Sequence, residues 1–443
     1  MQPALLIENG TLLSTGGTAS VRRGHSVLIE DGFITRVAPG REFAGYTGER
    51  LSAAGKVVIP GLVNAHTHLY STFARGFAKA RPSRDFMGVL RNLWWRLDSA
   101  LTTEDCYQSA LVALIDAVRH GTTTLIDHHA SPGAVGGSLD AVARAVGESG
   151  LRACLCYEVS DRNGAAVAQE GLAENVHFIR RCQAHGGSNL RALFGLHASF
   201  TLSDRTLEDA ASLGHALEVG FHIHAAEAKV DQQAARRSSR TGVIDRLTRL
   251  GILGRRSIAA HCVHVSPREI ASLAETGTAV VHNPQSNLNN AVGIAGIVEM
   301  ARRGVLVGLG TDAMTANLLE EARAALWAQH HASGNPSCGF GEVTGALFGA
   351  NARIAGRIFG LRLGEIRKGC AGDLAIFDYD PPTPLGDANA LVHALFGLSQ
   401  AQVDATIVGG RVLMEHGRLK LDIDEARVNA RSRELARKLW QRM

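Results

Sequence analysis

The feature that most constrains this chain is an alternation of short apolar runs with longer amphipathic segments between residues 57 and 309. Eight runs have the character of buried strands, and segments between them, such as 104–120 and 139–148, space their apolar residues as helices do. The runs cover residues 57–66, 121–127, 151–157, 191–197, 219–224, 257–261, 278–282 and 304–309. Eight βα units over roughly 250 residues are typical of an α/β fold, the (β/α)8 TIM barrel, which we predict here. The alternative, a doubly wound open sheet, would be expected to carry G-x-G-x-x-G after its first strand, and this sequence does not.

The two ends of the chain have a different pattern, in which short β-rich runs are separated by glycine. The runs ALLIENG, SVLIEDG and FITRVAP precede the barrel, and DLAIFDYD, ATIVGG and RVLMEHG follow it, before a helical pattern at 424–441. Neither set is large enough to bury a core by itself. We therefore predict that residues 1–56 and 365–443 form one composite β-sandwich with a C-terminal helix, and that residues 57–364 form the barrel.

The segment 70–100, which contains Trp94 and Trp95, is too long for an ordinary βα connection. We interpret it as a helical excursion over the barrel mouth that helps to shape a substrate pocket. An outer packing layer for the two tryptophans is the alternative, and whether the segment closes over a substrate stays open.

Composition narrows the classes of protein to consider. The formal charge is only +4 in 443 residues, which does not indicate a nucleic-acid partner, and no apolar run reaches the ~18 residues of a membrane span. The first residues, MQPALLIENG, lack the layout of a signal peptide. Seven scattered cysteines indicate reduced thiols in a cytoplasmic protein rather than a disulfide framework. No P-C-x-x-C accompanies them, which excludes the cytidine-deaminase type of zinc site.

A pair of histidines, His66 and His68, ends the first run. Residues i and i+2 of a strand point to the same side, and neutral imidazole is the commonest metal ligand in proteins. Such a pair is weak by itself in a chain with 19 histidines. It gains weight because polar residues end later runs too, where the active sites of TIM barrels lie. These residues are Asp127, His197, His224, His261, His282 and Asp312.

The chemistry of a hydrolytic metal site can be assigned to several of these positions. His224 supplies a third imidazole, and Glu227, three residues later on the following loop, stands where a general acid/base is needed. Asp312 can complete the ligand set and accept a proton from water, and His261 can stabilise the attacking water or the developing oxyanion. A zinc-like ion lowers the pKa of water from about 15.7 to near 7, which favours hydroxide by roughly 12 kcal/mol. The alternatives are a helix-dipole role for Glu227 and a helix cap for Asp312.

The number of ions follows from the fourth run. A two-metal hydrolase of this architecture would need a carboxylated lysine there, and the run reads LFGLHASF with His197 in that place. We therefore predict one ion with a position open for water, and His197 as a hydrogen-bond partner of the substrate. His222 is expected to point away from His224 and is left out of the ligand set. The remaining pairs, 128–129 and 330–331, are interpreted as supporting or packing histidines.

These motifs together resemble the amidohydrolase superfamily, in the branch that holds guanine deaminase, the S-adenosylhomocysteine and methylthioadenosine deaminases and the triazine chlorohydrolases. PGLVNAHTH, HIHAAE, AAHCVH, HNPQSN and GLGTDA stand in the expected order, and HTHLYSTFARGF and NLWWRLDSAL look most like the SsnA-type aminohydrolases, which are linked to purine metabolism. The resemblance implies one divalent ion per chain, usually zinc and in some members iron. It implies that the ion is bound by His66, His68, His224 and Asp312. It also implies that Glu227 protonates the ring nitrogen, His261 assists the attacking water and His197 contacts the substrate.

We therefore predict a metal-dependent aminohydrolase that deaminates a nitrogen heterocycle, such as a purine-like base, with metal-activated water, and we expect a homodimer or higher homo-oligomer. A cyclic amidohydrolase that opens a ring and a catalytically inactive scaffold are the alternatives. Adenosine-type deaminases carry a Trp-Pro-x-Glu-like segment whose carboxylate binds the nucleoside, and this sequence reads WWRLD at 94–98. A free heterocycle is therefore expected rather than a ribose-bearing substrate.

Overall fold

The eight predicted strands are present and run parallel in two sheets, of order β6-β7-β8-β9 and β10-β11-β12-β13-β14. The computed structural model describes residues 4–16, 19–78, 80–186 and 189–443, so the predicted N-terminal boundary at residue 1 lies outside the described residues. The strands are β6 (Leu62–Thr67), β7 (Thr122–Asp127), β8 (Arg152–Leu155), β9 (Leu190–Ala192), β10 (Phe194–Ala198), β11 (Phe221–Ala225), β12 (Ile258–His261), β13 (Ala279–His282) and β14 (Val307–Leu309).

Hydrogen bonds along both seams join these two sheets into a barrel. β9 and β10 are one strand interrupted at Leu193, whose N–H donates to the Leu155 carbonyl at 3.2 Å. At the other seam the Thr311 N–H donates to the carbonyl of His66 at 2.9 Å. A Cβ at Gly310 would lie 2.6 Å from that same carbonyl oxygen, so only glycine allows β14 to approach β6 this closely. The prediction of a TIM barrel is confirmed.

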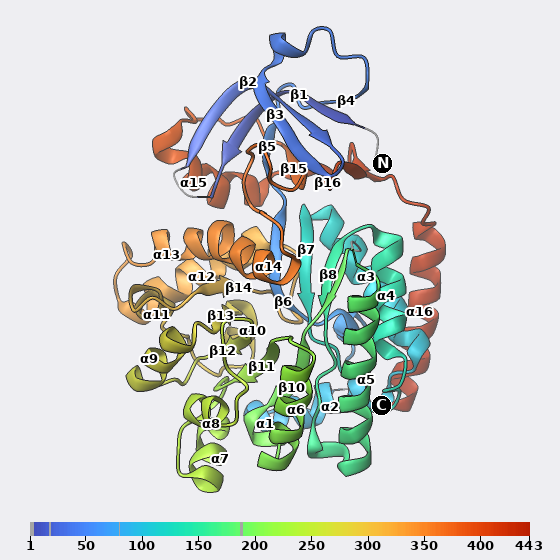
Figure 1. The fold of residues 1–443 in the computed structure, drawn as a ribbon, viewed down its shortest axis with the longest axis vertical. Helices are drawn as coiled ribbons and strands as arrows, with labels where there is room; N and C mark the ends of the chain where they lie inside the picture. The colour runs from blue at the N-terminus through green and yellow to red at the C-terminus, as the bar shows by residue number, and fades with distance from the viewer. Residues whose placement is uncertain (1–3, 17–18, 79, 187–188) are drawn as a thin grey trace.

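Helices surround the barrel (Figure 1), and some of them, α3 and α9 among them, start at a capping residue. Thr102 and Asp105 form a capping box at the first turn of α3, and Ser266 and Glu269 form another at α9. The helices of the barrel are α3 (Thr103–Arg119), α4 (Ser138–Ser149), α5 (Ala165–Ala184), α6 (Asp204–Ala216), α7 (Lys229–Ser239), α8 (Val243–Arg249), α9 (Pro267–Thr276), α10 (Pro284–Asn289), α11 (Ile297–Arg302), α12 (Leu318–Ser333), α13 (Phe340–Gly345) and α14 (Asn351–Phe359). Their apolar faces pack on the strands and make the largest core cluster.

Both ends of the chain contribute to a second β-structure, which lies at one end of the barrel (Figure 1). Its strands are β1 (Leu5–Ser14), β2 (Ser20–Glu30), β3 (Phe33–Pro39), β4 (Glu49–Ser52), β5 (Val57–Pro60), β15 (Leu374–Asp378), β16 (Gln402–Val408), β17 (Arg411–Glu415) and β18 (Arg418–Leu419). Hydrogen bonds connect all nine in one continuous sheet rather than in two separate sheets. Leu5, Ile29, Leu374 and Ile407 share one buried cluster, so the two ends of the chain depend on each other for their core.

The first predicted strand, 57–66, is in fact two strands. β5 pairs antiparallel with β15 in the nine-stranded sheet, and β6 enters the barrel. The break falls at Pro60-Gly61, where a Cβ on Gly61 would meet the Thr123 side chain at 2.2 Å. The apolar run continues through this turn because both strands are buried, and periodicity alone therefore does not divide it.

The terminal helix α16 (Glu425–Arg442) lies along the barrel beside α3, at the right of Figure 1. Gln108 Nε2 on α3 donates to the Val428 carbonyl at 2.9 Å, and Trp440 Nε1 donates to the Phe73 carbonyl at 2.8 Å. The predicted division assigned this helix to the composite β-sandwich; because of these contacts we propose that it belongs to the barrel domain instead. A short helix α15 (Ala390–Val392) lies in the segment between β15 and β16.

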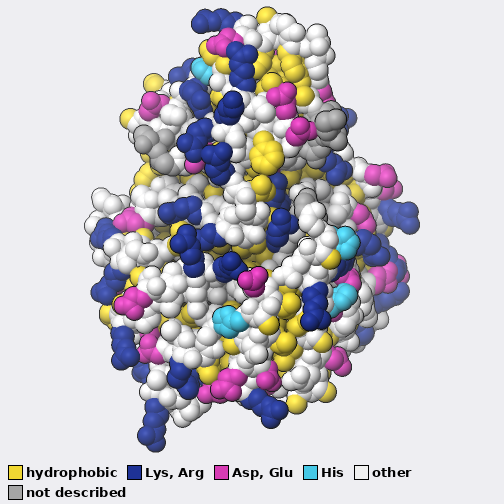
Figure 2. Space-filling model, viewed as in Figure 1, with side chains coloured by type: hydrophobic (Ala, Val, Ile, Leu, Met, Phe, Trp, Pro, Cys, Tyr) yellow, Lys and Arg dark blue, Asp and Glu magenta, His cyan; other side chains and the backbone are white. Residues whose placement is uncertain are grey.

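The surface carries charges of both signs. On the face in Figure 2, Lys and Arg side chains are scattered over both parts of the molecule with Asp and Glu side chains between them. Within the described part of the chain, no helix combines the length and apolar character that crossing a membrane requires.

Candidate metal centre

Three imidazoles converge at the carboxyl end of the barrel. His66 lies in β6, His68 follows that strand directly, and His224 lies in β11. His68 Nε2 lies 3.3 Å from His224 Nε2 and 3.0 Å from Asp312 Oδ1, and His66 Nε2 lies 3.9 Å from the same carboxylate oxygen. The structure thus brings together all four residues that were predicted as ligands, within 4.8 Å for the set of His66, His68 and Asp312.

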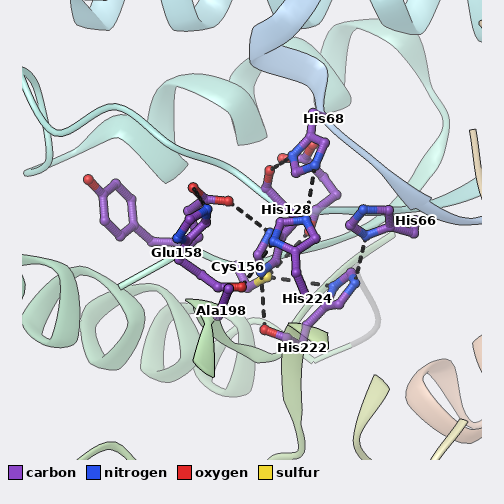
Figure 3. Close-up of polar contacts among 12 residues, drawn as sticks. His66, His68, His128, Cys156, Glu158, Ala198, His222 and His224 are labelled. Atoms are coloured by element: carbon purple, nitrogen blue, oxygen red, sulfur yellow. Dashed lines mark hydrogen bonds and ion pairs between the residues drawn. The ribbon is translucent and has the colours of Figure 1, made fainter. Parts of the chain in front are cut away.

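The second ring nitrogen of each imidazole is held by another group. The partners are His222 Nε2 for His66 Nδ1 (2.9 Å), the His197 carbonyl for His224 Nδ1 (3.0 Å) and the His128 carbonyl for His68 Nδ1 (2.5 Å). Figure 3 shows His222 reaching His66. Because Nδ1 is held, Nε2 of each ring is directed to the common centre, as histidines that bind metals usually are. His66 Nε2 is buried and has no hydrogen-bond partner among the described residues, which fits a site built for a cation.

The electrostatics of the cluster also favour a cation. Burial and the neighbouring His68 imidazole hold the pKa of His66 well below its ordinary value, so His66 is a neutral donor. Burial disfavours the charged form of His68, but the hydrogen bond and charge of Asp312 outweigh it and raise the pKa of His68 to about 9. Without an ion, a proton on His68 therefore balances the Asp312 carboxylate. Three imidazoles and one carboxylate are a donor set typical of zinc and similar divalent ions.

Glu227 and His261 face the same centre from neighbouring strands. Burial and the Asp312 charge raise the pKa of Glu227 well above its ordinary value, which favours the protonated form of this side chain. Burial lowers the pKa of His261 to about 4, and its Nδ1 accepts from Asn287 Nδ2 at 2.9 Å. The hydrogen of this neutral ring is therefore on Nε2, which lies 3.6 Å from Glu227 Oε2 and 3.8 Å from Asp312 Oδ2.

The backbone is strained where these side chains leave their strands. Ala226, His261, Cys262 and Asp312 all have left-handed φ angles, of 50°, 72°, 50° and 52°. Each such residue costs about 1–3 kcal/mol, and strain of this kind concentrates at functional sites. A sequence pattern gives no sign of it, because the residues are not glycines.

A cavity opens beside the cluster. Its wall includes Phe86, Trp94 and Trp95, from a helical segment made of α1 (Phe86–Val89), a π-helical turn (Leu90–Trp94) and α2 (Trp95–Ala100). Phe200 lines the cavity as well. This placement supports the interpretation of the segment 70–100 as a shaper of the pocket. Flat aromatic walls suit a planar heterocycle.

Three other strand-end residues that the sequence suggested as candidates lie outside the proposed ligand set. The His197 ring lines the cavity, and its Nδ1 lies 2.6 Å from Thr201 Oγ1. Asp127 Oδ1 accepts from the Leu69 N–H at 2.7 Å and so fixes the loop after β6. His282 is buried at the end of β13 and does not line this cavity.

Sequence reasoning missed two groups. His222 was left out, yet it holds the ring of His66. Glu158, directly after the third predicted run, lines the cavity and lies beside His128 and His197. Burial would raise the pKa of Glu158, but the two histidines outweigh it and lower the pKa to about 2. The rule that identified the other strand ends would have found Glu158, because it follows its run immediately.

Comparison with known families and proteins gives consistent matches. The model of the amidohydrolase family matches residues 57–413. The 5-methylthioadenosine/S-adenosylhomocysteine deaminase of Desulforudis audaxviator is 33% identical over 446 residues, which cover 98% of this chain and 99% of that protein. The 5'-deoxyadenosine deaminase of Methanothermobacter thermautotrophicus is 32% identical over 422 residues, which cover 94% of this chain and 95% of that protein.

Solved structures match over the same extent. An adenosine deaminase from Xanthomonas campestris with bound zinc superposes with a TM-score of 0.86 at 25% identity, covering 98% of each chain. Guanine deaminase of E. coli superposes with a TM-score of 0.78 at 20% identity, covering 94% of this chain and 100% of that chain, which shows a shared fold.

Proposed function

This chain belongs to the amidohydrolase family of metal-dependent hydrolases, and we propose that it removes an amino group, as ammonia, from a purine-like nitrogen heterocycle. The observation that carries the proposal is the convergence of three imidazole Nε2 atoms and one carboxylate on a cavity that is also lined by Glu227, whose pKa is raised by burial and by the Asp312 charge. A carboxylic acid with a raised pKa can give its proton to a ring nitrogen when water attacks the neighbouring carbon.

We propose that the ion is a single zinc held by His66, His68, His224 and Asp312. The donor set and the bound zinc named for the Xanthomonas campestris protein support this choice. When bound, the ion supplies Lewis-acid activation of water at neutral pH.

The remaining steps fall to side chains of the cavity. Asp312 accepts a proton from the attacking water, and the Nε2 hydrogen of His261 is donated to the incoming oxygen. Glu227 gives its proton to the ring nitrogen as the C–O bond forms. The C–N bond then breaks as the amino group takes up the proton that Asp312 accepted, and ammonia leaves. The hydroxyl proton of the adduct returns to Glu227 as the C=O bond forms.

We propose a free heterocycle rather than a nucleoside as the substrate, although relatives are named for nucleosides. The support is Asp98, which occupies the segment where a nucleoside-binding carboxylate would be expected. Its Oδ2 is paired with Arg162, so this oxygen is already engaged. Comparing ammonia release from adenine with ammonia release from adenosine, both with the zinc-loaded protein, tests directly whether the substrate is a free base or a nucleoside.

A screen of purines, pterins and pyrimidines for ammonia release tests the function itself. We expect ammonia from at least one amino-substituted ring, with the ring intact in the ultraviolet spectrum. Loss of ring absorbance without ammonia would favour ring opening instead. Only trace metal in protein expressed with zinc would favour an inactive scaffold.

We also propose that the protein works in the cytoplasm as a homo-oligomer. All seven cysteines are free, and six of them are buried, as expected for a protein that keeps its thiols reduced. Trp327 on α12 is 51% exposed and offers an apolar contact for another copy. Light scattering of the purified protein measures the oligomeric state.

A further inference from the structure

The part of the cavity wall that β8 and β10 contribute presents two hydrogen-bond acceptor atoms that have few hydrogen-bond donors nearby. Glu158 Oε1 lies 3.9 Å from His197 Nε2, which is too long for a hydrogen bond between them. Both residues line the cavity. A substrate that enters the cavity therefore meets these two atoms side by side.

The hydrogen bonds of Thr201 fix which His197 nitrogen carries the hydrogen. The Thr201 hydroxyl donates its single hydrogen to the Ala198 carbonyl at 3.1 Å, so it accepts from His197 Nδ1 at 2.6 Å. With the hydrogen on Nδ1, the neutral ring of His197 offers a lone pair at Nε2. The ring is thus an acceptor on its cavity side.

The lowered pKa of Glu158 favours its charged form, and an imidazole lies behind it on the side away from the cavity. Its Oε2 lies 3.1 Å from His128 Nδ1, and His128 Nε2 lies 3.1 Å from the His222 carbonyl, which can only accept. Figure 3 shows Glu158 extending toward His128. Oε2 therefore faces His128, and Oε1 is the oxygen that lies beside His197 at the cavity. The Glu158 side chain is 4% exposed, so its charge interacts strongly with a ligand bound beside it.

The charged side chains of the cavity wall also favour a substrate without negative charge. Five acidic side chains line the cavity, and no Lys or Arg does so among the described residues. These are Asp98, Glu158, Glu227, Asp231 and Asp312. Arg162 is close, but it pairs with Asp98 and lies over the Trp95 ring at 5.2 Å. A carboxylate or phosphate on the substrate would find no Lys or Arg side chain among these wall residues.

From these contacts we infer that the site selects an uncharged heterocycle that presents N–H donors, from ring nitrogen or amino groups, to Glu158 Oε1 and His197 Nε2. Glu158 is then a specificity-determining residue, and substrates with anionic substituents are rejected. The inference rests on the proposed function in one respect. The proposed function sets which C–N bond is cleaved, and the N–H donors that meet Glu158 and His197 lie on the edge of the heterocycle away from that bond.

Binding tests this without relying on turnover. Calorimetry with the zinc-loaded full chain, in a Glu227→Gln background so that ligands are not consumed, compares 2,6-diaminopurine, 9-methyladenine and adenosine monophosphate. We expect 2,6-diaminopurine, which has both an extra amino group and a ring N–H, to bind about tenfold or more tightly than 9-methyladenine. Adenosine monophosphate is expected to bind no better than 9-methyladenine.

Glu158→Gln should abolish most of the preference for 2,6-diaminopurine. Glu174→Gln is the matched control, because Glu174 is buried as well but accepts from the backbone N–H groups of Gly137 and Leu139 instead. The control should leave the preference unchanged. If Glu158→Gln does not fold, Thr201→Val, which frees the His197 ring, should reduce the same preference.

Three results would overturn the inference: an unchanged preference in Glu158→Gln, tighter binding of adenosine monophosphate, or no binding of any of the three compounds. Failure of the proposed function has a different signature. In that case the unsubstituted zinc-loaded protein releases no ammonia from any of these compounds, while the Glu158-dependent binding preference persists.

Discussion

Replacing His222 by leucine is expected to weaken metal binding without unfolding the protein. His222 Nε2 lies 2.9 Å from His66 Nδ1, and both side chains are fully buried. When His66 binds an ion through Nε2, its hydrogen must be on Nδ1, which donates to His222. Leucine fills a similar volume but accepts no hydrogen bond, so the Nδ1 hydrogen is left without a partner.

The size of the effect follows from the cost of that unpaired donor. A buried donor without a partner costs about 1–3 kcal/mol, and about 1.4 kcal/mol corresponds to a factor of ten. Zinc affinity should therefore fall roughly 5- to 150-fold, in line with the 10–100-fold typical of groups that orient metal ligands. In the metal-free protein His66 can carry its hydrogen on Nε2 instead. The penalty therefore falls on metal binding rather than on folding.

Competition with a chromophoric chelator measures the zinc affinity of both proteins. His282→Leu is a matched control, because His282 is fully buried on the next strand but one and has no hydrogen-bond partner on either ring nitrogen among the described residues. Its zinc affinity should stay within about twofold of the parent. Equal zinc affinity in His222→Leu, with an unchanged melting temperature, would refute the role of His222.

The other predictions concern activity. Glu227→Gln should keep its zinc and lose roughly 10²–10⁴ in kcat, since the amide has no proton to give; near-normal turnover with full zinc content would remove Glu227 from this role. His66→Ala should lose both zinc and activity, as metal analysis beside an ammonia assay would show; an active, zinc-replete variant would contradict the ligand set. Glu227 acts in its protonated form and its pKa is raised, so kcat/KM should be constant at low pH on this limb and fall as pH rises through that pKa. The falling limb should be missing in the residual activity of Glu227→Gln, and its persistence would assign the limb to another group.

Much of the fold follows from periodicity along the chain. Alternation of strand-like and helix-like segments predicts the barrel, and the glycine-separated runs at both ends predict that those ends meet in one β-structure. The error at 57–66 has a local cause, because two successive strands are both buried and the run shows no polar break at Pro60-Gly61. That the nine strands form one sheet, and that α16 covers α3, depends on contacts between distant segments.

The sequence by itself determined which residue types stand at the strand ends, and parallel strands of a barrel bring those ends together whatever lies between them. His66, His68, His224 and Asp312 could therefore be proposed as ligands before any coordinates. Only the tertiary structure decided what holds each imidazole and what faces the substrate. His66 and His222 are 156 positions apart, and their contact depends on how strands of the two sheets pack across the barrel. The same packing turns Glu158 and His197 toward one cavity, a relation that no local spacing encodes.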